Sequence, residues 1–378
     1  MFNDLKHLSQ EDVNRLMERY YDGENVKKLI KEYNINVAPN CLVKLFPPLK
    51  VDNYLCEYCK ANLVMERLSK SFKYIERHES EFYCPNCYHR PYIKNCQCKN
   101  CLEKAEKIKK EKEEKLKIYF SNVYAPVEFD TISFENKVYL GALCRALLKE
   151  NLYEICPYVK VNIKITPLKG FLINIYRNLS KARIIVVSPL SDINAFVWNK
   201  EGIPNEYYIE EVEYYLNLSF GEEKYDMFNK ILNPDYYNNS LAGEGFYLWK
   251  KIAVEECIEY LLYQLRKVSF EFSPGEKTYK TFEMILNDFS VSQIYGIIWK
   301  SVSEASRLYL EKRMTKKHAA NSVIGACERY ADRAKINKWN LVSYNRIPDL
   351  PQSILSEFFF YKVLKIGDKG FYSVPQIL

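Results

Sequence analysis

Seven of the twelve cysteines lie in one short segment near the start of the sequence, with spacing typical of metal binding. Two Cys-x-x-Cys pairs, Cys56 with Cys59 and Cys84 with Cys87, can each direct two sulfurs at one centre. Four thiolates complete the tetrahedral shell that Zn²⁺ prefers. The sequence therefore predicts structural zinc in residues 51–102.

A second group of candidate ligands follows the second pair and consists of His89, Cys96, Cys98 and Cys101. One imidazole and three thiolates also satisfy a tetrahedral zinc ion. A different partition joins the second Cys-x-x-Cys pair with Cys98 and Cys101, and leaves the first pair to recruit another ligand such as His89. Spacing leaves both partitions open, and the eight ligands predict one or two zinc ions, with two the better match.

Filled shells of protein ligands are typical of structural and not of catalytic zinc. No glutamate stands in the His-x-Glu arrangement that zinc deaminases require. The stretch between the two pairs, residues 60–83, is long enough for a β-hairpin that brings the pairs together. The pairs and this stretch resemble a zinc ribbon of the kind found in bacterial transposases, transcription-associated proteins and defence-island proteins. The resemblance is specific for metal but not for function, because ribbons bind DNA, RNA or other proteins.

Residues 1–50 predict three short helices. Apolar side chains recur at helical spacing after Ser9, again in residues 26–33, and again in residues 38–46. Gly23 separates the first two stretches. This order resembles the helix-turn-helix of resolvases and transposase-like proteins, in which the third helix reads DNA.

That resemblance implies a set of DNA contacts. Asn40 and Lys44 would face the major groove, and Lys27, Lys28 and Lys31 would hold phosphates. The third helix offers few polar residues besides the first two. A three-helix module that contacts only protein is the alternative.

Residues 103–121 predict a charged helical connector, and residues 122–378 predict a mostly helical, aromatic-rich domain with a few strands. The expected fold class is therefore mainly α, with a small zinc-ribbon β module in a multidomain chain. The helices predicted from residue 220 onward span 223–232, 245–268, 276–288, 291–313, 316–336 and 351–364. The predicted strands span 158–166, 182–187 and 193–198. Ser290 and Gln293 form a capping-box pattern.

The large domain shows no nucleotide-binding or hydrolase motif. Asp130, Glu135 and Lys137 give only a faint nuclease-like pattern, because their spacing is short for that geometry. Glu255 and Glu256 predict the solvent-facing side of a long helix. The sequence therefore names no catalytic residue.

The net charge of +7 over 378 residues permits a nucleic-acid partner without requiring one. No signal peptide or membrane-length apolar run is present, and a metal-type cysteine cluster fits the reducing cytoplasm. We therefore expect a cytoplasmic, zinc-stabilised, DNA-binding or nucleic-acid-associated protein from a prokaryotic mobile-element or phage-defence setting. The helical domain would serve partner binding or self-association. The alternatives are a protein-interaction scaffold without nucleic acid, and an effector or enzyme with an unrecognised site.

Overall fold

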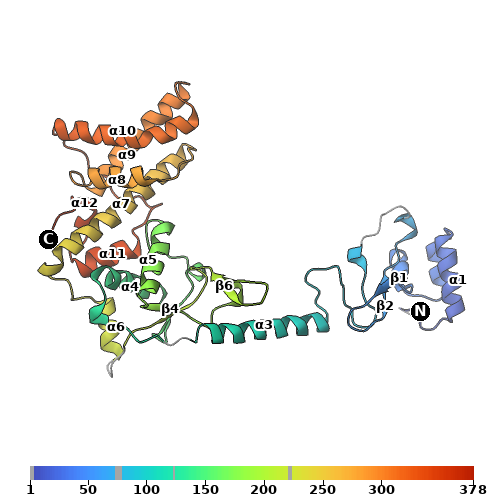
Figure 1. The fold of residues 1–378 in the computed structure, drawn as a ribbon. Helices are drawn as coiled ribbons and strands as arrows, with labels where there is room; N and C mark the ends of the chain where they lie inside the picture. The colour runs from blue at the N-terminus through green and yellow to red at the C-terminus, as the bar shows by residue number, and fades with distance from the viewer. Residues whose placement is uncertain (1–3, 73–78, 122–123, 220–223) are drawn as a thin grey trace. The chain divides into compact units, whose positions relative to one another are not determined.

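The computed structural model describes residues 4–72, 79–121, 124–219 and 224–378. The chain divides into two units, Met1–Lys112 and Glu113–Leu378 (Figure 1). Helices hold 53% of the residues and strands 9%, and the sheets are small and antiparallel. The predicted fold class, mainly α and multidomain, is confirmed. The division between the units falls inside residues 103–121, the segment predicted as a connector.

The smaller unit contains short elements: α1 (Gln10–Tyr21), α2 (Val26–Glu32), the 3-10 helix η1 (Pro39–Leu45), β1 (Leu49–Leu55), β2 (Asn62–Met65), η2 (Lys70–Phe72) and η3 (Glu79–Glu81). Side-chain caps begin the first two helices, since Ser9 accepts from the Asp12 N–H and Asn25 accepts from the Lys27 N–H. The apolar faces of these helices and η1 form one core, which includes Leu16, Tyr20, Leu29, Ile35, Leu42 and Phe46.

The structure corrects the type of the third helix in the predicted helix-turn-helix. Residues 38–46 do not form an α-helix, because η1 (Pro39–Leu45) is a 3-10 helix. The burial of Leu42, Val43 and Phe46 would fit an α-helix as well, so the apolar pattern does not distinguish the two helix types. At about 120° per residue, side chains four positions apart point in different directions. Asn40 and Lys44 therefore do not share one face, as the sequence interpretation requires.

The hairpin of the cysteine segment also differs from the prediction. Strands β1 and β2 pair antiparallel, with Leu49 opposite Met65 and Leu55 opposite Asn62. The turn between them holds the first Cys-x-x-Cys pair, so this hairpin surrounds that pair. Between the two pairs the described residues show one antiparallel bridge, Val64 with Tyr83, and residues 73–78 lie outside the described part.

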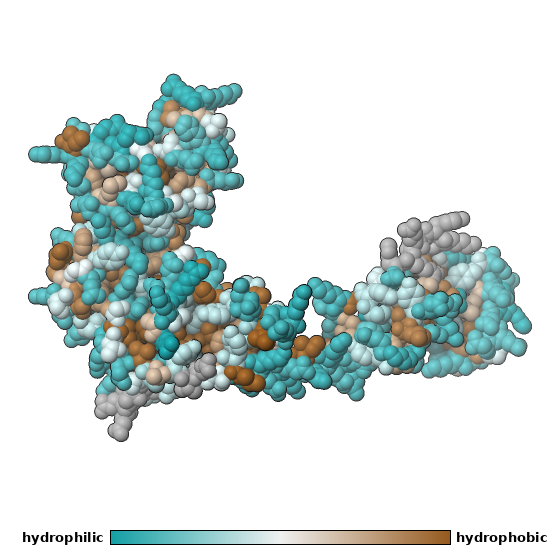
Figure 2. Space-filling view, in the orientation of Figure 1, coloured by the Kyte–Doolittle hydropathy of each residue, from teal (hydrophilic) through white to brown (hydrophobic). Residues whose placement is uncertain are grey.

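Helix α3 (Lys99–Tyr119) is solvated along most of its length. Only Leu116 is buried, and pairs such as Lys99–Glu103 and Glu106–Lys110 lie one turn apart. Figure 2 shows a mostly hydrophilic surface along this helix.

The larger unit is built on helices: α4 (Phe134–Leu147), α5 (Lys169–Lys181), α6 (Lys224–Leu232), α7 (Ala242–Lys267), α8 (Glu276–Ile285), α9 (Val291–Leu310), α10 (Lys316–Ile336), α11 (Ile354–Glu357) and α12 (Lys369–Tyr372). The π-helix η8 (Phe358–Val363) continues α11. Its 3-10 helices are η4 (Phe129–Thr131), η5 (Tyr158–Lys160), η6 (Ile193–Ala195) and η7 (Asn239–Leu241).

Its strands are short: β3 (Glu154–Ile155), β4 (Ile185–Val187), β5 (Phe196–Trp198), β6 (Pro204–Tyr207) and β7 (Tyr214–Leu216). Strand β7 lies between β3 and β4 in one antiparallel sheet, and β5 pairs with β6 in another. The predicted strand over 158–166 is wrong, because this stretch begins as η5 and has no partner strand among the described residues.

The helices predicted from residue 245 onward correspond to α7, α8, α9 and α10, and 351–364 divides into α11 and η8. The capping box at Ser290 and Gln293 is confirmed at the start of α9. Helix α5 was missed, although Phe171, Leu172 and Ile175 are buried at helical spacing.

Helix α7 lies in the core of the larger unit, which corrects a second expectation. Glu255 and Glu256 are not solvent-facing, since they are only 8% and 2% exposed. Glu256 forms an ion pair with Arg346 (Nη2–Oε1, 2.9 Å) and accepts a hydrogen bond from Ser356 Oγ (2.8 Å). One oxygen of Glu255 has no hydrogen-bond partner among the described residues. No helix of the described part is long and apolar enough to span a bilayer.

Candidate metal centres

Each Cys-x-x-Cys pair lies in a turn that two backbone hydrogen bonds close. In the first turn the Cys56 N–H donates to Ala61 O at 2.8 Å, and the Lys60 N–H donates to Cys56 O at 3.0 Å. Lys60 has a φ of 59°, in the left-handed region that favours glycine. This backbone places the two sulfurs of the pair on the same side of the turn.

The second turn repeats that geometry. The Cys84 N–H donates to His89 O at 2.8 Å, and the Tyr88 N–H donates to Cys84 O at 2.9 Å. Tyr88 has a φ of 56°, like its counterpart in the first turn. The same turn is therefore used twice, once for each pair of sulfurs.

A single pair of residues joins the second turn to the hairpin. Val64 of β2 and Tyr83 exchange two backbone hydrogen bonds, of 2.8 and 2.9 Å. Tyr83 directly precedes Cys84, so this pairing brings the second turn beside the first. Leu63 and Phe82 pack with the buried cysteines in a small core.

The four sulfurs of the two pairs converge. Cys59 Sγ lies 3.2 Å from Cys84 Sγ and 3.9 Å from Cys87 Sγ, and Cys56 Sγ lies 3.5 Å from Cys87 Sγ. These distances exceed the ~2.05 Å of a disulfide, and all four cysteines are free. Four sulfurs at about 2.3 Å from one zinc ion lie about 3.8 Å apart in a tetrahedron. The spacing therefore fits a shared metal ion.

The second ligand group converges in the same way. His89 Nδ1 lies 3.2 Å from Cys101 Sγ and 3.7 Å from Cys98 Sγ. With Cys96, their ligand atoms all lie within 4.8 Å of one another. Tetrahedral zinc with ordinary bond lengths separates nitrogen from sulfur by about 3.6 Å. Cys101 belongs to the first turn of α3, so the long helix begins at this group.

The grouping found is the first of the two partitions that the sequence left open. One group contains Cys56, Cys59, Cys84 and Cys87, and the other contains His89, Cys96, Cys98 and Cys101. Each group offers four ligand atoms, and each is geometrically able to hold a metal ion. Within the described part of the chain, no other set of three or more such side chains converges.

Two residues of the first turn, Glu57 and Tyr58, lie against ligands of the second group. The sequence analysis did not predict these contacts. Glu57 Oε1 lies 3.4 Å from His89 Nε2, and the Tyr58 hydroxyl lies 3.5 Å from Cys101 Sγ. The Tyr58 ring packs edge-on against the His89 ring, with 4.8 Å between centroids. His89 Nε2 has no hydrogen-bond partner among the described residues, so Glu57 lies close to the ring, where a carboxylate can orient a metal-binding histidine, without a hydrogen bond to it. The position of both residues between two cysteine ligands was the available signal.

The surroundings shift the pKa values of the cysteine thiols in different directions. Burial raises the pKa of Cys87 to about 12 and of Cys98 to about 11, with neighbouring sulfurs adding to both effects. Burial also opposes ionisation of Cys96, but backbone N–H donors, chiefly Arg90 at 3.2 Å, lower its pKa to about 6. A cation within the groups would stabilise the thiolates that burial disfavours, so metal binding would release protons.

Comparison with known proteins identifies no relative. No protein-family model, no curated protein and no solved structure matches the chain. The interpretation of the site therefore depends on its own chemistry.

The five predicted DNA-contact residues are all exposed. Lys27, Lys28 and Lys31 lie on the outer side of α2, and none forms an ion pair within the described residues. Asn40 and Lys44 lie on η1 and point in different directions, as described above.

Both positive and negative side chains lie next to α2. The Arg19 guanidinium forms ion pairs with Glu24 at 2.8 Å and with Glu32 at 2.6 Å. Arg19 chiefly, and Lys28 to a smaller extent, lower the pKa of both carboxyls. Lys28 therefore lies within a partly neutralised cluster, and Lys27 and Lys31 are the freer cations of this helix.

The faint nuclease-like pattern of the larger unit does not form a site. Lys137 Nζ donates to the backbone oxygen of Asp130 at 3.1 Å. Glu135 Oε1 instead accepts hydrogen bonds from Tyr139 (2.6 Å) and Lys251 (2.7 Å). Lys137 thus contacts only the backbone of Asp130, and the Glu135 carboxylate is bound by Tyr139 and Lys251, so the three side chains do not converge.

Proposed function

We propose that residues 1–112 form a nucleic-acid-binding module held together by two structural zinc ions. The observation that carries this proposal is the pair of complete four-ligand groups, one Cys₄ and one Cys₃His. Nitrogen and thiolate ligands in fours are the donor set of structural zinc, and they leave no position for substrate. The small hydrophobic core around Cys56 and Cys84 supports a stabilising role for the metal.

Helix α2 supplies the nucleic-acid surface in this proposal. Lys27 and Lys31 lie four residues apart on one face of α2, exposed and without carboxylate partners among the described residues. Such lysines hold phosphates, and their contribution falls steeply with salt because counterions are released. Lys44 of η1 adds a third cation near the core that α1, α2 and η1 share. Because η1 is a 3-10 helix, we do not propose that it contacts base edges in the major groove.

We further propose a cellular compartment and a biological setting for the protein. None of the twelve cysteines forms a disulfide, which supports a reducing cytoplasmic compartment. The combination of ribbon-like and helical modules supports a mobile-element or phage-defence setting only by analogy. The larger unit would bind a partner or a second copy.

The test is fluorescence anisotropy of a labelled duplex DNA at several salt concentrations. Lys27→Glu combined with Lys31→Glu should weaken binding and reduce the slope of log K against log salt by about 2. Lys104→Glu with Lys107→Glu is the matched control, because it makes the same charge change on solvated α3. Binding that is indifferent to the α2 changes would reject the DNA proposal and favour a protein partner.

A further inference from the structure

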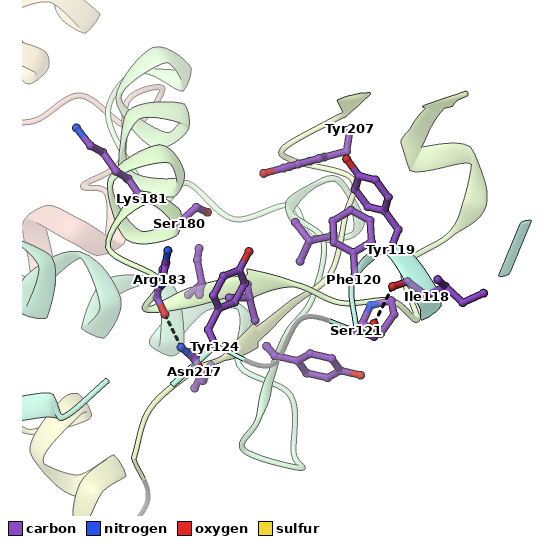
Figure 3. A pocket seen from close by; sticks show the side chains of 16 residues that line it. Ile118, Tyr119, Phe120, Ser121, Tyr124, Ser180, Lys181, Arg183, Tyr207 and Asn217 are labelled. Carbon is purple, nitrogen blue, oxygen red and sulfur yellow. Dashed lines mark hydrogen bonds between the residues drawn. The ribbon is translucent and has the colours of Figure 1, made fainter. Parts of the chain in front are cut away.

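The larger unit has an open cleft of about 850 Å³ that no part of the zinc module lines. Sixteen residues form it, from the end of α3 and the following segment, the end of α5, strand β4, Tyr207 of β6, and β7 with Asn217 (Figure 3). None of these lining residues is acidic, and Lys181 and Arg183 are basic. The cleft is therefore electropositive at its wall.

One side of the cleft is aromatic. Tyr119 and Phe120 lie edge to face, with 5.0 Å between ring centroids, and Tyr207 lies beside them in Figure 3. Tyr119 is half exposed and Phe120 and Tyr207 are partly buried, so the rings keep accessible surface. Aromatic rings in this state offer a stacking surface for a planar group.

The opposite side presents a cation. The Arg183 guanidinium lies 4.8 Å from the centroid of the Tyr124 ring, a cation–π contact that holds it at the wall. Arg183 forms no ion pair within the described residues, so its charge is available. The Lys181 side chain also lines the cleft, but in Figure 3 it extends away from the aromatic side.

Asn217 holds the backbone of Arg183 close to the segment that carries Tyr124. Its Nδ2 donates to Arg183 O at 2.9 Å and to Ala125 O at 3.2 Å. These two bonds tie the residue that follows Tyr124 to the backbone of Arg183. The cation and its aromatic neighbour are thus set in place before any ligand arrives, which lowers the entropic cost of binding.

We propose that this cleft binds a nucleotide unit, with its base against Tyr119, Phe120 and Tyr207 and its phosphate at Arg183. Stacking surfaces select a planar heteroaromatic ring, and a guanidinium without a carboxylate partner selects phosphate through paired N–H donors. The unit can be a free nucleotide or an unpaired residue of a single-stranded nucleic acid. The proposal is independent of the zinc module, because residues 1–112 contribute no lining residue.

The experiment measures binding of two probes to the full chain by fluorescence anisotropy: a fluorescent ATP analogue and a fluorescein-labelled oligothymidylate. Arg183→Gly removes the cation and suits the backbone, since Arg183 has a φ of 56° after the end of α5. Tyr119→Ala removes an exposed ring. Each variant should weaken binding about tenfold, as loss of one stacking or phosphate contact does.

Lys277→Ala is the matched control, because Lys277 is exposed on α8 and does not line the cleft; it should change the affinity less than about threefold. Binding of the ATP analogue identifies a free nucleotide, whereas binding of the oligothymidylate alone identifies a single strand. The oligothymidylate arm is repeated with Lys27→Glu and Lys31→Glu, which separates this cleft from the α2 surface. Failure of both probes to bind, or binding unchanged by Arg183→Gly and Tyr119→Ala, would overturn the proposal.

Discussion

Glu255 and Glu256 of α7 are neighbours in sequence and both buried, yet we predict opposite effects for the same substitution. Burial raises the pKa of Glu255 to about 7, only partly offset by Lys251, and one carboxylate oxygen has no partner among the described residues. Glu256 is instead held by Arg346 and Ser356. The perturbation is Glu255→Gln, with Glu256→Gln as the matched comparison.

The difference in protonation between the folded and unfolded chain sets how the free energy of unfolding depends on pH. A carboxyl with a raised pKa binds more protons in the folded than in the unfolded chain between its two pKa values, so stability falls as pH rises through 7. A pKa of about 7, against an ordinary value near 4.5, corresponds to about 3 kcal/mol at pH 8 and under about 1 kcal/mol at pH 5. Glu255→Gln should recover about 2 to 3 kcal/mol more at pH 8 than at pH 5.

The assay is urea unfolding followed by tryptophan fluorescence. All four tryptophans, Trp198, Trp249, Trp299 and Trp339, lie in the larger unit, so this signal reports the unit that contains α7. Glu256→Gln should destabilise by about 3 kcal/mol at both pH values, because it leaves the Arg346 charge unpaired. Equal effects of Glu255→Gln at pH 5 and pH 8 would refute the reasoning.

Three further predictions concern both units. Removing metal with a chelator should abolish hydrogen-exchange protection in residues 51–102 and leave the tryptophan signal unchanged; retained protection would contradict it. Tyr88→Gly should stabilise the second turn by about 0.5 to 1 kcal/mol, measured by chelator competition, because Tyr88 is 72% exposed with a positive φ; weaker metal retention would count against this. Gly141→Ala should cost about 1 to 3 kcal/mol in urea unfolding, since the added Cβ would lie 2.3 Å from Phe358. Gly170→Ala, a helical site with open space, should be neutral or stabilising, and equal losses at both glycines would contradict the packing argument.

The metal ligands were predictable because their information is local. A Cys-x-x-Cys turn directs its sulfurs together whatever the rest of the chain does, so the eight candidates could be named from spacing. Their grouping was not local, because it depends on the pairing of Val64 with Tyr83 and on the turn before α3. The supporting roles of Glu57 and Tyr58 also appear only when the two groups lie side by side.

Helices with strong end signals were found, as at Ser290, whereas two shorter elements were misread. At η1 the buried residues Leu42, Val43 and Phe46 are spaced as in an α-helix, so the apolar pattern could not reveal the 3-10 helix. Residues 158–166 have a strand-like composition but find no partner strand among the described residues. The cleft was not foreseeable, because Tyr119, Arg183 and Tyr207 come together only through tertiary packing.

The most direct test of the account is metal analysis of the purified full chain by mass spectrometry under native conditions. Two zinc ions per chain are expected, and Cys101→Ser combined with His89→Ala should leave one, because those residues belong to the second group alone. A chain without metal, or a loss of both ions from a change confined to one group while the fold persists, would contradict the two-site arrangement.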